Sequence, residues 1–366
     1  MGACMNRRSF FKGAGMLGLG GIAAAVGGIA WGRARNPYYS GPVSDHFDGL
    51  RFFVPNGEAP KGFVDLIRWQ LSGGRKPWPD RFPSSHSDAP PERVEGERLR
   101  VSFVGHATML LQMEGLNVLT DPVWSERCSP VSWAGPKRVN DPGIPFDSLP
   151  PIDVVLLSHN HYDHLDVATL SRLRERHDPL VVTPLGNDTI LRDHDPKVRT
   201  LARDWGDTVE LPGGARATLV PAHHWSARGT TDRRNALWCA FVLEHPKAGK
   251  VYHVGDTGWF GGRFHSAIGG EHGPFRLSLQ PFGAYVPRDF MRAQHQNPDE
   301  AVQAHLVSRA AWTLGHHWGT FQLTDEHIDD QIHDLDAARE RHGVDADTFR
   351  RLRPGEWWDV PPMPAA

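Results

Sequence analysis

The most regular alternation of hydrophobic and polar positions starts at Leu99. Three short segments, 99–104, 108–113 and 116–120, are rich in aliphatic and β-branched residues and are separated by Gly-His-Ala and Glu-Gly turns, which is typical of paired strands. The continuous apolar segment 154–157 predicts a strand buried on both faces. Further strands are expected at 311–314 and near the following positions: Val181, Ala217, Leu237, Val251 and Leu277.

Helical patterns are interspersed among these strands. The segments 167–176 and 335–341 are expected to be helical, and Asn297-Pro298-Asp299-Glu300 predicts a helix start. In that start Asn297 is the N-cap, Pro298 takes the first helical position and Glu300 completes a capping box. Because strands and helices alternate without a linker, residues 97–366 are expected to form one α/β domain of layered sheets.

Residues 31–96 have few periodic apolar positions and many turn residues, so we interpret them as an N-terminal extension that wraps the domain. It contains one predicted helix, 62–71, with Phe63, Leu66, Ile67 and Leu71 on one face and Trp69 beside it. Two interpretations of this apolar stripe remain open. It is either ordinary core packing or a surface that faces lipid.

Residues 1–30 have the pattern of an export signal. Paired arginines, Arg7 and Arg8, precede an uncharged stretch at 13–30 that is rich in Gly, Ala and Leu, which is typical of the twin-arginine route. A short membrane anchor is the alternative, since 18 uncharged residues are near the lower limit for a spanning helix. We therefore expect the protein in the periplasm or attached to the outer face of the inner membrane, with cleavage of the signal left open.

Composition narrows the classes of function. A formal net charge of −3 over 366 residues excludes the strongly basic face of a dedicated nucleic-acid binder. The chain has only three cysteines, and Cys128 and Cys239 could either pair in an oxidising compartment or stay as buried thiols. It has 21 histidines, and because imidazole is the commonest metal ligand, their positions decide the next step.

Four metal-competent side chains follow the predicted strand 154–157 within six residues: His159, His161, Asp163 and His164. The ends of strands are where α/β folds display their chemistry, and a loop there can curl these groups around ions. Imidazole and carboxylate ligands together suit zinc, with iron or manganese as alternatives. The pattern therefore predicts a metal site.

Three later segments supply further ligands, each directly after a predicted strand. They contain the pair His223-His224, then Asp256, then the pair His316-His317. If all four loops lie along one edge of stacked sheets, their side chains suffice for two metal ions. Two cations that share a water lower its pKa and stabilise the charge that develops when a phosphodiester, a lactone or a β-lactam is hydrolysed.

The order His-x-His-x-Asp-His, His, Asp, His resembles the binuclear metallo-β-lactamase superfamily, which has a four-layer αββα sandwich. More narrowly, the segments "GHATMLLQMEGLNVLTDPVWSERCSP", "LPPIDVVLLSHNHYDHLD", "PAHHW", "GDTG", "FGAYVPRDFMRAQHQNPDEAV" and "HHWGTF" resemble the N-acylphosphatidylethanolamine-hydrolysing phospholipase D family. The likeness extends from about Leu99 to the C-terminus. The stretch 283–302 with "HWGTF" is its more specific part.

The resemblance implies a ligand set on these positions. The first metal would be held by His159, His161 and His224. The second would be held by Asp163, His164 and His317. Asp256 would bridge both ions. Within each doubled histidine the one before Trp matches the family's "HW", which leaves His223 and His316 as structural neighbours. His rather than Glu at position 161 argues against the di-iron, oxygen-reducing relatives of this fold.

Other residues are candidates for supporting roles. Asp121 would either fix the tautomer of a ligand histidine or simply form a turn before Pro122, and His106 would either line the site or be a buried turn residue. Tyr162, Gln294 and His295 are the predicted substrate-binding residues. Catalysis is assigned to Asp163, Asp256 and His295. Trp225 and Trp318, which follow ligand histidines, are expected to buttress the site.

Together with the metal ligands, the resemblance implies a binuclear zinc phosphodiesterase of phospholipase D type. Its substrate would be N-acylphosphatidylethanolamine or a related glycerophospholipid, and its products N-acylethanolamine and phosphatidic acid. A lactonase or a phosphodiesterase for small soluble substrates is the alternative on the same fold, and a non-catalytic metal-binding protein is the alternative of another class. Expected partners are a phospholipid or another phosphodiester substrate and a membrane surface, with no nucleic acid and with homodimerisation open. The candidates for lipid contact are Phe52, Phe53, Phe63, Ile67 and Trp69.

Overall fold

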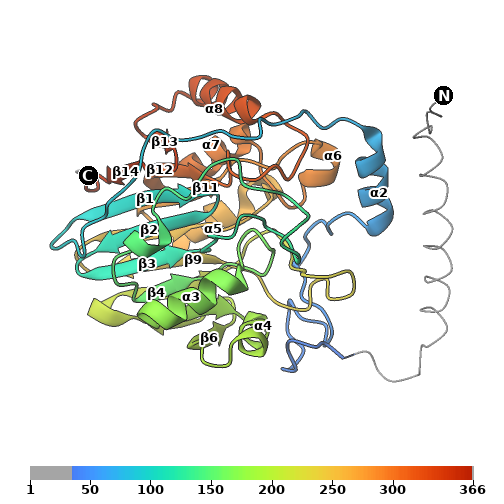
Figure 1. The fold of residues 1–366 in the computed structure, drawn as a ribbon, viewed down its shortest axis with the longest axis horizontal. Helices are drawn as coiled ribbons and strands as arrows, with labels where there is room; N and C mark the ends of the chain where they lie inside the picture. The colour runs from blue at the N-terminus through green and yellow to red at the C-terminus, as the bar shows by residue number, and fades with distance from the viewer. Residues whose placement is uncertain (1–34, 365–366) are drawn as a thin grey trace, which may run out of the picture. The chain divides into compact units, whose positions relative to one another are not determined.

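A computed structural model describes residues 35–364 of the chain, and the predicted export signal at 1–30 lies outside these residues. Two seven-stranded sheets form the centre of the domain (Figure 1). The first sheet has the order β14-β1-β2-β3-β4-β5-β6, and the second has the order β13-β12-β11-β10-β9-β8-β7. The first six strands thus all belong to the first sheet, and the next six all belong to the second. The last two strands, β13 and β14, are edge strands of the second and the first sheet, respectively.

The strands of the first sheet are β1 (Leu99–Gly105), β2 (Thr108–Met113), β3 (Leu116–Thr120), β4 (Val154–Leu156), β5 (Leu180–Pro184), β6 (Thr200–Arg203) and β14 (Trp357–Asp359). Those of the second are β7 (Thr208–Glu210), β8 (Arg216–Val220), β9 (Ala240–His245), β10 (Gly249–His253), β11 (Phe275–Pro281), β12 (Ala310–His316) and β13 (Phe349–Arg351). The central strands β3, β4, β5 and β10, β11, β12 run parallel within their sheets. Parallel central strands place their carboxyl ends at one edge of each sheet.

The hydrophobic core lies between the two sheets. Val101 and Leu111 of the first sheet share one buried cluster with Leu219, Phe241 and Leu279 of the second. Every residue of β1, β2, β3 and β11 is buried, as expected for strands covered on both faces. Burial of this apolar surface contributes about 25 cal/mol for each Å² removed from water and is the main force that holds the sheets together.

Helices cover the outer face of each sheet (Figure 1). Helix α3 (Val167–His177) and helix α4 (Asn187–His194) pack through Leu170, Leu173 and Leu191 on the first sheet. Helices α5 (Arg263–Glu271), α7 (Pro298–Val307) and α8 (Ile328–His342) lie on the second, and α7 contacts β11 and β12. The structure is thus a four-layer αββα sandwich, which confirms the predicted fold class.

The start of α7 follows the predicted capping pattern. The Asn297 side chain accepts a hydrogen bond from the Glu300 amide, 2.8 Å away, and the Glu300 carboxylate accepts one from the Asn297 amide, 2.9 Å away. Pro298 takes the first helical position, where no amide donor is needed. This local motif fixes the start of α7 directly after the segment that carries Gln294 and His295.

Some expected elements differ in the structure. The strand expected near Leu237 lies three residues further on, at Ala240–His245, because Leu237 is buried in a loop before the sheet begins. Helix α8 is longer than expected and starts at Ile328. Strands β13 and β14 were not predicted, since each has three residues and is defined by pairing with β12 and β1 rather than by its own sequence.

The N-terminal extension contains helix α2 (Phe63–Ser72), as predicted, but the core-packing interpretation of its apolar stripe is wrong. No residue of α2 is buried, and Phe63 and Leu71 are 67% and 80% exposed. Trp69 anchors the helix by packing against Phe290 with tilted rings, whose centroids are 4.8 Å apart. Helix α2 therefore presents apolar side chains to the surface, and Figure 1 shows the helix outside the sheet layers.

The expectation that Phe52 contacts lipid is also wrong. Phe52 is fully buried, and its ring packs on Phe47 and Tyr39 at centroid distances of 4.5 and 5.3 Å. These aromatic residues join the core cluster of the second sheet. Within residues 35–364, no helix is both long and apolar enough to span a membrane. Cys128 and Cys239 are both buried free thiols, so the disulfide alternative is not seen.

Candidate metal centre

The predicted ligands meet at the carboxyl edge of both sheets. The loop 158–166 follows β4 in the first sheet, while His224 follows β8, Asp256 follows β10 and His317 follows β12 in the second. The β1–β2 turn reaches the same edge because β1 runs parallel to β3, and it adds His106. Residues that are far apart in the sequence therefore converge because their strands share one direction.

Three imidazoles form one half of the cluster. Nε2 of His159 lies 2.9 Å from Nδ1 of His161, and Nε2 of His224 lies 3.2 Å from the same Nδ1. The carboxylate of Asp256 is next to them, with Oδ2 at 3.9 Å from His159 Nε2 and 3.8 Å from His224 Nε2. Ring nitrogens that all face one point are the arrangement of a three-histidine metal site.

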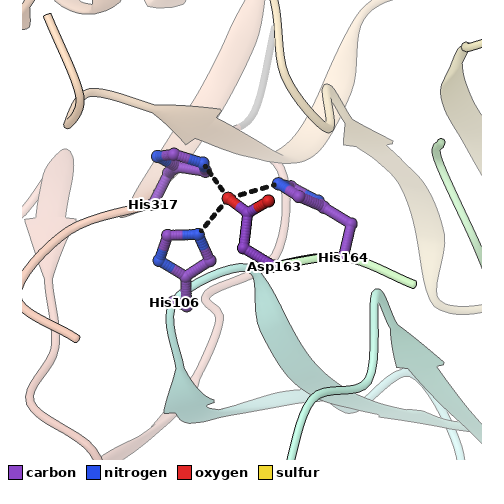
Figure 2. Close-up of side chains that lie close together, drawn as sticks. All are labelled: His106, Asp163, His164 and His317. Carbon is purple, nitrogen blue, oxygen red and sulfur yellow. Dashed lines mark hydrogen bonds and ion pairs between the residues drawn. The ribbon is translucent and has the colours of Figure 1, made fainter. Parts of the chain in front are cut away.

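The other half of the cluster combines carboxylates and imidazoles. Oδ2 of Asp163 lies 3.6 Å from His164 Nε2 and 3.2 Å from His317 Nε2 (Figure 2). Oδ2 of Asp256 lies 3.1 Å from each of the same two nitrogens. Asp256 therefore stands between the two halves, which is the position that the resemblance implies for a bridging ligand.

Buried atoms without partners test whether these residues fit a metal. Nε2 of His164, Oδ1 of Asp256 and Nδ1 of His295 are buried and make no hydrogen bond within the described chain. Leaving a buried polar atom unsatisfied costs about 1–3 kcal/mol, so several such atoms at one point indicate a missing ligand. The mixed nitrogen and oxygen donors suit zinc, and also iron or manganese. The residues fit a metal centre.

The electrostatics of the two halves differ. Burial, reinforced by the neighbouring imidazoles, lowers the pKa of His159 well below its usual value and that of His161 to about 3. These rings are therefore neutral near pH 7, which is the form that binds a cation. Burial also opposes protonation of His317, but the Asp256 and Asp163 carboxylates outweigh it and raise the pKa of His317 to about 9.

The carboxylates stay ionised in spite of their burial. Burial alone would raise the pKa of Asp163 and Asp256, but the adjacent His164 and the other imidazoles hold both pKa values well below the usual range. Without a metal, protonated His164 and His317 provide the compensating positive charge. A bound cation would take over that role, because it would be the largest local charge.

A second layer of hydrogen bonds orients the ligands. Oδ2 of Asp121 lies 2.9 Å from His164 Nδ1 and also accepts a hydrogen bond from the Ser158 hydroxyl. Both alternatives for Asp121 hold together, since it also turns the chain after β3 with a left-handed φ of 37°. Sequence reasoning missed His253, whose Nε2 lies 3.3 Å from the same carboxylate oxygen. Its place in β10, three residues before Asp256, was the available signal.

His106 lines the site, as one of its two interpretations predicts. Its Nε2 lies 2.9 Å from Asp163 Oδ2, and its ring lies 4.0 Å from that of His317 (Figure 2). The main chain supports this contact, because the His317 amide donates to the His106 carbonyl at 2.9 Å. His106 thus contacts both an acidic and an imidazole member of the cluster, although the resemblance does not place it among the ligands.

In each of the two His-His pairs, only the second histidine faces the ligand cluster. His224 faces the cluster, and its Nδ1 lies 2.8 Å from the Gln294 carbonyl, whereas His223 stacks on Phe260 with ring centroids 4.4 Å apart. His317 faces the cluster, whereas His316 is fully buried beside His253. The structure therefore brings together all seven ligands that the resemblance implies, and it leaves His223 and His316 outside.

The predicted substrate residues flank the cluster. His295 is nearest, with Nδ1 at 3.9 Å from Asp256 Oδ2. Gln294 is buried and borders a cavity beside the site, whereas Tyr162 borders a different cavity. Their binding and catalytic roles stay predictions.

The two tryptophans lie against the site. The Trp225 ring packs edge-on against His161, with centroids 4.7 Å apart. Trp318 is buried next to Phe282, with centroids 5.7 Å apart.

The cavity that Gln294 borders has a volume of about 540 Å³ and mostly apolar walls. It lies between helix α2, the loop after His224 and the short helix α6 (Arg288–Met291). Its lining includes the side chains Phe63, Leu66, Trp69, Trp225 and Phe290. An apolar cavity with a few polar groups is typical of a substrate site when it lies beside a cluster of side chains whose pKa values are shifted.

Comparison with known proteins agrees with this geometry. Residues 116–318 match the family model described as "Beta-lactamase superfamily domain". An uncharacterised protein of Mycobacterium tuberculosis is 33% identical over 353 residues, which cover 93% of this chain and 91% of that protein. The N-acyl-phosphatidylethanolamine-hydrolyzing phospholipase D 1 of Caenorhabditis elegans is 36% identical over 276 residues, which cover 72% of this chain and 76% of that protein.

Among solved structures, the isothiocyanate hydrolase from Delia radicum gut bacteria has the same fold, with a TM-score of 0.56 and 18% identity over 71% of this chain and 99% of that one. The family match covers the ligand segments from Asp121 to Trp318. Because both the strand order and the sequence of these segments are shared, the chain belongs to the β-lactamase superfamily, in the family of the N-acyl-phosphatidylethanolamine-hydrolysing phospholipase D proteins, and is a metal-dependent hydrolase.

Proposed function

We propose that the protein is a binuclear zinc phosphodiesterase of phospholipase D type that hydrolyses N-acylphosphatidylethanolamine or a related glycerophospholipid. The observation that carries the proposal is the position of a large apolar cavity directly beside the ligand cluster. Trp225 and Gln294 line the cavity, and both also contact the cluster, Trp225 through the ring of His161 and Gln294 through Nδ1 of His224. A substrate with acyl chains next to its phosphodiester fits this arrangement.

The surface around the cavity supports a membrane substrate. Helix α2 forms one wall, and its outer face exposes Phe63 at 67%, Val64 at 69% and Leu71 at 80%. Large exposed apolar side chains on one short helix are typical of a surface that meets lipid. Each acyl methylene buried in the cavity would contribute about 0.8 kcal/mol, so a few contacts favour a lipid over a small soluble substrate.

In the proposed reaction the metal ions and the protein side chains have different tasks. When bound, the metal ions would polarise the phosphodiester and lower the pKa of the attacking water. Asp121 holds the His164 ring by its Nδ1, so that Nε2 faces Asp163 and Asp256. The Gln294 carbonyl holds His224 in the same way, so that its Nε2 faces the cluster. Both contacts fix ring orientation before the substrate arrives.

His295 is the residue we assign to the phosphodiester. Burial lowers its pKa well below the usual value, so the ring is neutral and carries a single N–H. Its unpartnered Nδ1 faces the Asp256 side of the cluster, where it is placed to hydrogen-bond the substrate. In the proposed reaction water attacks phosphorus, the P–O bond to the N-acylethanolamine oxygen breaks, and that oxygen takes up a proton.

Export by the twin-arginine route completes the proposal, because this route would deliver a folded, metal-loaded enzyme to the outer face of the inner membrane. The decisive experiment combines metal analysis with assays of the full-length protein on a phospholipid panel. N-acylphosphatidylethanolamine should be cleaved to N-acylethanolamine and phosphatidic acid, and chelation should abolish the activity. Cleavage of lactones or small phosphodiesters, with the lipids untouched, would overturn the lipid assignment.

A further inference from the structure

A second cavity borders the metal-binding loop and shares no lining residue with the apolar one. It has a volume of about 350 Å³ and lies between the segment 125–132, residues 165–168 at the start of α3, Tyr162 and Arg228. Tyr162 connects it to the metal centre, because its neighbours in the chain are the ligands His161 and Asp163. A group bound here would therefore lie beside the same loop that holds the metals.

Arg228 gives this cavity a cation that forms no direct ion pair, although the carboxylates of Asp166 and Asp232 lie near enough to act on its charge. Its guanidinium stacks over the Tyr162 ring at 3.9 Å from the centroid, and Nη1 donates to the carbonyls of Asn160 and Leu165 at 3.0 and 2.8 Å. Within residues 35–364 it forms no ion pair with a carboxylate, and Arg127, which also lines the cavity, donates only to the Gly135 carbonyl. Both cations can accept an anionic partner.

The acidic residues of the cavity are already engaged. Glu126 pairs with Lys137 at 2.8 Å. Asp166 caps helix α3 and accepts hydrogen bonds from the Ser125 amide at 3.0 Å and from the Thr169 hydroxyl at 2.6 Å. Glu126 is neutralised by Lys137, but the donors to Asp166 are neutral, so its carboxylate keeps its charge. Arg127 and Arg228 together outweigh Asp166, so the lining keeps an excess of positive charge, and the serine side chains 125, 129 and 132 add hydrogen-bonding groups.

We propose that this cavity is a headgroup subsite that binds a second anionic group of the substrate, a carboxylate or a phosphate carried by the headgroup. The proposal rests on the phosphodiesterase function proposed above and makes it more specific. The apolar cavity would receive acyl chains, the metal centre the phosphodiester, and Arg228 the additional anion. The enzyme would then prefer N-acylated glycerophospholipids that carry such a group over those that lack it.

Two lipids that differ by one carboxylate test the preference. N-palmitoylphosphatidylethanolamine and N-palmitoylphosphatidylserine with the same diacylglycerol would be assayed in micelles of an uncharged detergent, and the ratio of their kcat/KM values measured. The wild type should favour the serine lipid about tenfold, because a charge-assisted hydrogen bond is gained. Arg228→Gln should remove the preference, and Arg127→Gln should reduce it. Arg199→Gln, a distant exposed arginine that pairs with Asp178, is the matched control and should keep it.

Because Arg228 also holds the carbonyls of the metal loop, its variant could lose metal as well as selectivity. Metal content would therefore be measured for every variant. Ser132→Asp avoids this problem, since it places a negative charge in the cavity without touching the bonds of Arg228. It should lower kcat/KM for the serine lipid more than for the ethanolamine lipid, whereas Ser132→Asn, of nearly the same shape, should leave the ratio unchanged.

The outcomes separate the subsite from the function. If both lipids are cleaved and neither Arg228→Gln nor Ser132→Asp changes the ratio, the subsite is wrong and the function stands. If the metal-loaded protein cleaves neither lipid, the proposed function itself fails. If the wild type shows no preference but binds inorganic phosphate in calorimetry, and Arg228→Gln loses that heat, the cavity takes a free anion and the headgroup assignment is overturned.

Discussion

Oδ2 of Asp121 lies 2.9 Å from Nδ1 of His164, and this contact links the end of β3 to the metal-binding loop after β4. The two strands are parallel neighbours, so their ends are held side by side by the sheet itself. The contact fixes the orientation of the His164 ring, with Nε2 turned towards Asp163 and Asp256. The orientation of a metal ligand is thus set by the register of two buried strands.

The first prediction follows from this contact. Asp121→Asn should weaken metal binding about 10- to 100-fold, as is usual when the residue that orients a ligand histidine is lost. Competition with a chromogenic chelator measures the affinity directly. Asp147→Asn, at an exposed aspartate that pairs with Arg176, is the control and should leave it unchanged. Equal affinities in both variants would show that Asp121 has only its role in the turn.

The second prediction concerns metal stoichiometry. The purified protein should contain about two equivalents of metal, mostly zinc, because its nitrogen and oxygen ligands form two groups joined by Asp256. Asp163→Asn or His317→Ala should lower the content to about one equivalent, since both belong to the same half of the cluster. Elemental analysis gives the count. One equivalent in the wild type, unchanged in both variants, would contradict a binuclear centre.

Helix α2 provides the third prediction. Phe63→Ser with Ile67→Ser should reduce activity on phospholipid vesicles several-fold more than on a short-chain soluble phosphodiester, because both side chains are exposed on the helix that forms one wall of the apolar cavity. Their exposure also means that the melting temperature should change little, which a melting curve checks. Gln70→Ser, at an exposed polar position of the same helix, is the control. Folded variants with full activity on vesicles would remove α2 from the lipid surface.

The fourth prediction is a loss of stability in mild acid. Burial lowers the pKa values of His265 and His305 to about 4 in the folded protein. The unfolded chain, with histidine pKa values near 6.5, then binds more protons, so stability falls as the pH decreases from about 6.5 towards 4. Each histidine should cost roughly 2 kcal/mol between pH 7 and pH 5.

Urea unfolding at the two pH values measures this loss. His265→Gln removes one titrating group and should make the free energy of unfolding less dependent on pH. Identical pH dependence in His265→Gln and wild type would show that His265 does not titrate as its burial implies.

The fifth prediction concerns export. Replacing Arg7-Arg8 by Lys-Lys should retain the folded protein in the cytoplasm, because the twin-arginine route requires the paired arginines. Cell fractionation followed by immunoblotting locates the protein. A periplasmic reporter that uses the general secretory route serves as the control for intact export. Unchanged export of the Lys-Lys variant would mean that residues 1–30 act as another kind of signal or as an anchor.

Local sequence was sufficient for the elements that carry the site. The apolar run at 154–157, the clustered ligands His159 to His164 and the capping box at Asn297 each depend on neighbours in the chain, and the structure has them within a residue or two of the expected positions. The polar segments after β8, β10 and β12 could also be recognised, because each directly follows an apolar strand. The layered α/β architecture and the edge where chemistry gathers were therefore determined by the sequence alone.

Other features depend on contacts between residues distant in the sequence, and only the tertiary structure decided them. Phe52 is buried because Tyr39 and Phe47 pack on it, whereas Phe63, equally apolar, has no cover and remains exposed. His253 lies beside Asp121 because the two sheets face each other, and no local pattern records that separation of 132 residues. Burial and long-range pairing arise between surfaces that meet only after folding. A local sequence pattern describes one of the two contacting residues but not its partner, which is distant in the sequence.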